Sequence, residues 1–85
     1  MDAHARHHRT VRLLEMRLEA LAVASQRSPL GDYRYERRIV AAAAATRHAI
    51  ALELISREEA GAIWATVAQR HPGVAWCQAG PQLAA

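Results

Sequence analysis

The residues best suited to chemistry are histidines near the start of the chain. His4 and His8 are four positions apart, so their imidazole rings would share one side of a helix. Two imidazoles in this geometry can chelate zinc or a similar metal, and His7 or Asp2 could supply a third ligand. A metal site needs three or four rigidly held ligands, whereas the first turn of a helix frays. We therefore favour solvated or packed histidines, predict no cofactor, and keep a metal site at His4 and His8 as a minor alternative.

A second group of residues is suited to binding. The segment 33–38 reads YRYERR, and tyrosine and arginine are enriched at binding hot spots because they combine large contact area with hydrogen bonds. They can also stack on bases and neutralise phosphates. The competing interpretation has equal weight: Tyr35 packs into the core, Glu36 pairs with an arginine, and the other side chains are solvated. The residues that we predict to contact a partner are Tyr33, Arg34, Arg37 and Arg38, supported by Arg9 and Arg12.

Motifs typical of catalysis are absent from the sequence. It has no glycine-rich phosphate loop, no nucleophile elbow and no HExxH pair, and its glutamates fall at positions suited to surface pairing. Cys77 has no CxxC partner and no neighbouring cation, so we expect a passive thiol. An intermolecular disulfide, or a metal contact with His71, is the alternative for this cysteine. We expect a protein that is not an enzyme.

Nucleic-acid binding is the alternative to protein binding. All 11 basic residues are arginine, and with 8 acids they give a net charge of only +3, a weak electrostatic footprint. Helices over about 33–54 and 57–71 could form a helix-turn-helix, but Glu58 and Glu59 would then face the DNA. The arginine bias and the abundant alanine indicate a GC-rich coding sequence from a bacterium or a phage.

Helices must position all of these residues, and the middle of the chain gives the strongest signal. Residues 39–54 read IVAAAAATRHAIALEL, which is apolar around most of a helical circumference and must be covered on more than one side. Five consecutive alanines also have the highest helix propensity available. We predict a helix over 33–54 with Asp32 as its N-cap, and a second apolar stripe at Val40, Ala44 and Ala51.

The first helix is predicted over about 2–24, with Asp2 as its N-cap. Apolar residues recur at steps of three and four along one seam, which His7 extends toward the N-terminus; this histidine could make an interface sensitive to pH. A second stripe lies on roughly the opposite side of the same helix. The seam consists of Val11, Leu14, Leu18 and Leu21, and the second stripe of Leu13, Met16, Ala20 and Val23.

The third helix is predicted over 57–71. Ser56 and Glu59 match the S-x-x-E capping box, and Pro72 with Gly73 ends the helix. Its apolar positions share one side, as expected for an outer helix packed against a hairpin. We expect residues 74–85 to form an irregular tail that Trp76 pins against the bundle.

Together these elements predict an all-α three-helix bundle. Residues 1–73 would form one domain, in which two long helices make an antiparallel hairpin and the shorter third helix packs across it. A chain of 85 residues buries too little surface to hide both stripes, so we predict a homodimer through the long helices. The single cysteine and the lack of a membrane span or secretion signal indicate the cytoplasm. The predicted function is non-enzymatic binding to a larger protein partner, as an adaptor, regulator or inhibitor.

Overall fold

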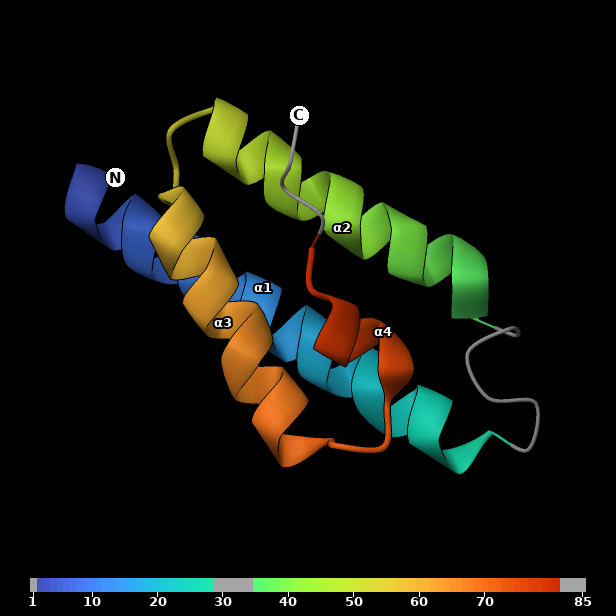
Figure 1. Ribbon diagram of the computed structural model, residues 1–85. Coiled ribbons are helices and arrows are strands. Elements are labelled where there is room, and N and C mark those ends of the chain that lie inside the picture. The colour runs from blue at the N-terminus through green and yellow to red at the C-terminus, as the bar shows by residue number, and fades with distance from the viewer. Residues whose placement is uncertain (1, 29–34, 82–85) are drawn as a thin grey trace.

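The computed structural model describes residues 2–28 and 35–81, which form helices and no strand. The helices are α1 (Ala3–Arg27), α2 (Glu36–Ala51), α3 (Arg57–Arg70) and α4 (Ala75–Ala79). Figure 1 shows α2 running back along α1 in the opposite direction, while α3 and α4 lie over this pair. The prediction of an all-α fold is confirmed for the described residues. None of the helices in these ranges is both long and apolar enough to cross a lipid bilayer.

Helix α1 begins as predicted and ends later than predicted. The Asp2 side chain caps it by accepting a 2.7 Å hydrogen bond from the Ala5 amide. The predicted end at residue 24 is wrong, because α1 continues to Arg27. Ser25, a turn-favouring residue in isolation, is buried in the helix, where its hydroxyl accepts a hydrogen bond from Trp76. The helix ends only where Ser28, the residue before a proline, is extended.

Helix α2 begins at Glu36, with Tyr35 as an N-cap that makes no side-chain capping bond. The predicted cap Asp32 lies outside the described residues. The predicted end at residue 54 is wrong, because α2 ends at Ala51 and Glu53 then has a left-handed φ of 60°. The Glu53 amide donates to the Ile50 carbonyl, and the next amide donates to Ala49, each at 2.9 Å. These two bonds form a Schellman motif, which terminates the helix even though glycine is absent.

Helix α3 has the predicted capping box. The Ser56 hydroxyl accepts from the Glu59 amide at 3.0 Å, and the Glu59 carboxylate accepts from the Ser56 amide at 2.9 Å. The side of α3 predicted to be apolar is buried, and Ala68 is partly buried at its edge. The helix ends at Arg70, one residue before the predicted boundary, because His71 precedes Pro72 and leaves the helical region.

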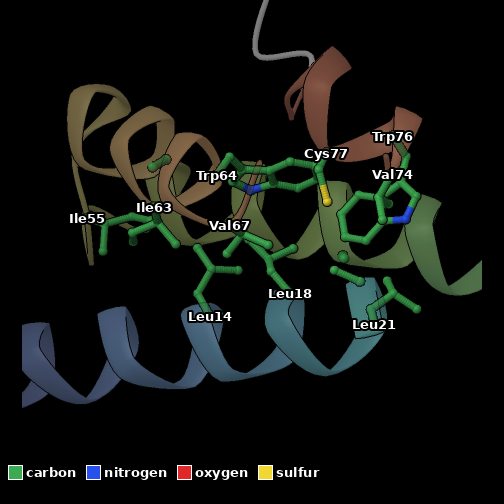
Figure 2. Close-up of a cluster of buried hydrophobic side chains, with 13 residues drawn as sticks. Leu14, Leu18, Leu21, Ile55, Ile63, Trp64, Val67, Val74, Trp76 and Cys77 are labelled. Atoms are coloured by element: carbon green, nitrogen blue, oxygen red, sulfur yellow. The ribbon is translucent and has the colours of Figure 1, made fainter. Parts of the chain in front are cut away.

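The segment after α3 differs from the predicted irregular tail because residues 75–79 form helix α4. Trp76 is the reason: its ring packs edge-on against Trp64, with ring centroids 5.6 Å apart and an interplanar angle of 86°. Its indole N–H donates to the buried Ser25 hydroxyl at 3.2 Å. Val74 and Cys77 are buried beside it (Figure 2). The expected anchoring by Trp76 is confirmed.

The hydrophobic core lies among all four helices. Leu14, Leu18 and Leu21 of α1 project into it, opposite α3 and α4 (Figure 2). From α3, the Trp64 indole N–H donates to the buried Thr46 hydroxyl of α2 at 3.1 Å. Each tryptophan thus buries a large apolar surface while its only polar group is satisfied.

Candidate interaction surface

Helix α1 presents an apolar surface that the rest of the described chain leaves uncovered. We call Leu13, Met16, Ala20 and Val23 the outer stripe of α1. Leu13 is 56% exposed and Met16 is 60% exposed, Ala20 is also exposed, and Val23 is half-buried. Because successive helical residues are 100° apart, this stripe faces away from the core seam. The expectation that the second stripe is left uncovered is therefore confirmed for Leu13 and Met16 with respect to residues 2–28 and 35–81.

Helix α2 has a weaker version of the same feature. Val40 is 60% exposed, and Ala44 and Ala51 are exposed on the same side. Alanine offers little area to a partner, so Val40 is the single large side chain of this surface. The outer stripe of α1 is therefore the stronger candidate for an interaction.

The predicted tyrosine and arginine cluster is only partly described. Tyr33 and Arg34 lie outside the described residues, and Arg37 is exposed. The Arg38 guanidinium lies 5.8 Å from the centre of the Tyr35 ring, a cation–π distance, while Tyr35 packs partly against the core. Among the described residues Glu36 makes no ion pair. Tyr35 thus behaves as the competing interpretation predicts, whereas Glu36 does not.

The two groups of predicted arginines lie at separate places. Arg9 is exposed on α1, and Arg12 lines a hollow between α1 and α3 together with Met16 and Arg70. Arg38 lines a different hollow, between α2 and residues 17–24 of α1. Residue 17 lies more than one helical turn after Arg12, and residue 24 lies about three turns after it. Arg9 and Arg12 therefore do not support the arginines of α2 in one continuous surface, because α2 begins beside the opposite end of α1.

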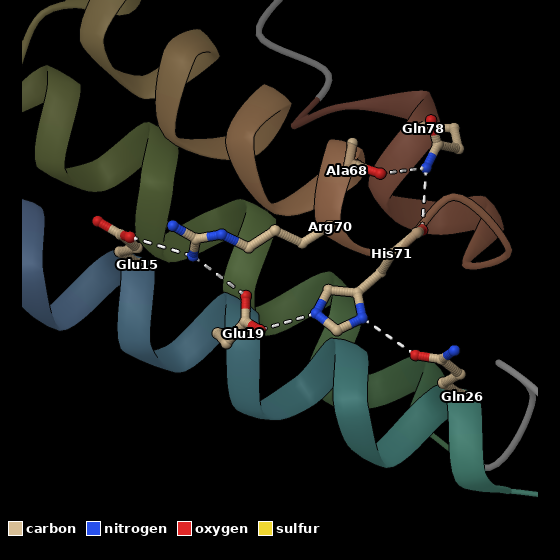
Figure 3. A network of polar contacts seen from close by, with 7 residues as sticks. All are labelled: Glu15, Glu19, Gln26, Ala68, Arg70, His71 and Gln78. Carbon is tan, nitrogen blue, oxygen red and sulfur yellow. Dashed lines mark hydrogen bonds and ion pairs between the residues drawn. The ribbon is translucent and has the colours of Figure 1, made fainter.

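A polar network fastens the end of α3 to Glu15, Glu19 and Gln26 of α1, which we call the polar strip of α1 (Figure 3). The ring nitrogens of His71 are hydrogen-bonded to Glu19 at 2.8 Å and to Gln26 at 3.0 Å. Arg70 lies 3.4 Å from Glu15 and 3.5 Å from the second oxygen of Glu19. That oxygen meets no hydrogen-bond criterion with any described residue, and the Arg70 guanidinium is the positive charge nearest to it.

The network changes the acidity of Glu19. The hydrogen bond from His71, aided by the charges of His71 and Arg70, holds the pKa of Glu19 below its ordinary value of 4.5. Glutamates expected to make ordinary surface pairs instead join two helices. This role was not predicted from the sequence. The signal that could have indicated it is the pair of acids Glu15 and Glu19 on the first helix, which complements the cations at the end of the third helix.

A second polar contact joins the starts of the two helices. The His7 ring is hydrogen-bonded to the Glu59 carboxylate, which also closes the capping box with Ser56. The Ser56 amide, followed by His7, lowers the pKa of Glu59 below its ordinary value. His7, predicted to extend the core seam, therefore contacts α3 within the same chain.

The histidine and cysteine candidates are not brought together. Among the described residues no group of three or more His, Cys, Asp or Glu side chains could hold a metal ion. His4 and His8 are exposed, while the proposed third ligands have other partners: Asp2 caps α1, and His7 contacts Glu59. Cys77 is 2% exposed in the core, and both ring nitrogens of His71 are engaged in the network described above. A surface disulfide at Cys77 would require this part of the core to open.

Comparisons with known proteins provide no relative from which a function could be carried over. No protein-family model matches the chain, and neither a curated protein nor a solved structure shows significant similarity to it. The functional interpretation therefore depends on the exposed surfaces and charges of the chain itself.

Proposed function

We propose that this chain is a non-catalytic binding protein that docks on a larger protein partner, as an adaptor, regulator or inhibitor. The contact surface is the outer stripe of α1, flanked by Arg9 and Arg12. One observation carries the proposal: Leu13 and Met16 are more than half exposed on a helix whose opposite side already closes a complete core. Single exposed apolar residues are common, but neighbouring ones on one helix face indicate an interaction site.

Recovery of the partner from the native host tests the proposal. The tagged wild-type chain would be compared with Leu13→Gln plus Met16→Gln, and with Val40→Gln as a control of equal exposure on α2. Glutamine keeps the helix propensity of leucine and methionine and slightly exceeds that of valine. We expect the double variant to recover about tenfold less of a protein that the wild type and the control retain.

Three outcomes would contradict the proposal. In the first, a double variant that melts like the wild type recovers the same proteins in the same amounts. In the second, the retained material is nucleic acid that dissociates as salt is added, which favours the alternative function. In the third, light scattering shows a homodimer that the double variant disrupts, which would assign the stripe to a second copy of the chain.

A further inference from the structure

A groove follows the outer seam between α1 and α2. It consists of two adjoining hollows of about 200 and 280 Å³, and Arg17 lines both of them. We call this feature the α1–α2 groove. Its floor is apolar, since the partly open edges of Leu14 and Leu21 reach it from the core. Ala45 and Ala49 form part of the α2 wall.

The spacing of the α1 wall fits a helical occupant. Thr10, Leu13, Arg17, Ala20 and Ala24 line the groove and follow one another at steps of three, four, three and four. This is the heptad spacing with which one helix receives the side chains of another. Small residues on both walls let the axis of an incoming helix approach closely. The spacing and the small side chains would allow a helix to lie along the α1–α2 pair.

The charged residues that line the groove within residues 2–28 and 35–81 are all of one sign. They are Arg17 and Arg38, and no acidic residue of these two ranges lines it. The hollow on the other side of α1 differs, because Glu15 and Glu19 lie there beside Arg70 and are compensated by it. The Arg38 guanidinium lies over the Tyr35 ring, and this ring packs against the core. The contact with Tyr35 therefore restricts the position of the Arg38 charge. The groove thus offers two arginines to an occupant, and no carboxylate from the described part of its wall competes for them.

We infer that the α1–α2 groove binds an acidic amphipathic helix of the partner protein. The apolar side of that helix would cover Leu13 and the alanines, while flanking carboxylates would pair with Arg17 and Arg38. A second copy of this chain fits less well, because its net charge is +3 and its own outer stripe is flanked by Arg9 and Arg12. This inference rests on the proposed protein-binding function and adds the chemistry of the partner.

Titration of the isotope-labelled full chain with synthetic peptides tests the inference. The probes are an amphipathic peptide of about three heptads with leucine on one side and glutamate on the other, a scrambled version, and a version with lysine for glutamate. NMR shifts report both affinity and location. We expect the acidic amphipathic peptide to bind about tenfold more tightly than either control and to shift the amides of Leu13, Arg17 and Ala45.

Charge reversal locates the effect in the groove. Arg17→Glu and Arg38→Glu should each weaken binding of the acidic peptide by about tenfold. Arg47→Glu is the matched control, because Arg47 lies half a turn around α2 from Arg38 and is absent from the groove wall. This control should leave the affinity unchanged. Thermal melting of each variant shows whether a loss of binding reflects unfolding.

Equal binding of the acidic and basic peptides, no binding, or shifts outside the groove would each overturn the inference. So would self-association through the groove in the absence of peptide. A different result would contradict the proposed function: recovery of the partner from the host that does not depend on Leu13 and Met16. If recovery depends on Met16 but is unaffected by Arg17→Glu, the proposed protein binding is retained and the inference of an acidic helix in the groove is rejected.

Discussion

The inner and outer sides of α1 carry similar side chains and have different surroundings. On the inner side Leu18 is fully buried among the other helices, whereas on the outer side Leu13 and Met16 are 56% and 60% exposed. Both stripes repeat at steps of three and four along the same helix. Apolar periodicity therefore fixes the direction in which a side chain projects, while the number of available neighbours decides whether it is buried.

Replacing the central inner leucine should have the largest effect. We expect Leu18→Ala to lower the free energy of unfolding by about 3 kcal/mol, because it leaves a cavity at a fully buried position. Leu13→Ala removes the same atoms from the outer side and should cost about 0.5 kcal/mol or less. Denaturant unfolding of both variants measures the difference. Equal losses of unfolding free energy in the two variants would mean that the inner and outer sides of α1 are equally packed.

Two threonines extend the comparison to polar groups. Thr46 and Thr66 each donate to the carbonyl four residues earlier, at 2.8 and 2.9 Å, but Thr46 is buried and also accepts from Trp64. Thr46→Val keeps the shape and leaves the indole N–H unsatisfied, so we expect a loss of about 1–3 kcal/mol. Thr66→Val, at an exposed position, should cost about 0.5 kcal/mol or less. Matching melting temperatures for the two variants would rule out a structural role for the Trp64 bond.

Acidification should loosen the attachment of α3 to the polar strip of α1. Because the pKa of Glu19 is lowered in the fold, its stabilising effect is present above the ordinary pKa of 4.5 and is lost as the pH falls through the folded pKa. Glu59 contributes in the same direction. We expect the free energy of unfolding to fall between about pH 5 and pH 3.

Urea midpoints across this range, measured for two variants, separate the network from general charge effects. Glu19→Gln should flatten the pH dependence, since the amide cannot titrate. Glu58→Gln, in the exposed first turn of α3, is the control and should keep the wild-type slope. A Glu19→Gln curve parallel to that of the wild type would show that the network contributes nothing to stability.

The smallest effects should come from the outer sides of the two long helices. Met16→Gln and Val40→Gln exchange an exposed apolar side chain for a good helix former, so each should change the free energy of unfolding by about 0.5 kcal/mol or less. Chemical denaturation of the isolated chain checks this expectation. A loss comparable to that of Leu18→Ala would show that these side chains already pack within the fold.

Local signals in the sequence predicted the three longer helices and their buried sides. The Asp2 cap, the Ser56–Glu59 capping box and the seam through Leu18 are each determined by residues within a few turns of one another. The exposure of Leu13 followed from the same spacing. These features were predictable because a helix fixes the relative directions of its own side chains.

Most features that depend on contacts between distant segments were not predicted, although the anchoring by Trp76 was. Helix α4 forms where Trp76 reaches Ser25, 51 positions earlier, and His71 reaches Glu19 across 52 positions. The end of α2 at a left-handed Glu53 had no glycine to mark it. Arg17 was not predicted as a candidate because the groove that it lines has its other wall on α2, which the spacing along α1 does not reveal.

The central claim is that a partner covers the outer stripe of α1 in the native host. Hydroxyl-radical oxidation of Met16 measures this directly, because Met16 is 60% exposed in the isolated chain and its sulfoxide is read by mass spectrometry. Dilute purified chain would be compared with the complex recovered intact from the host. We predict rapid oxidation of Met16 in the purified chain and strong protection in the complex. Equal oxidation of Met16 in the two samples would contradict the claim.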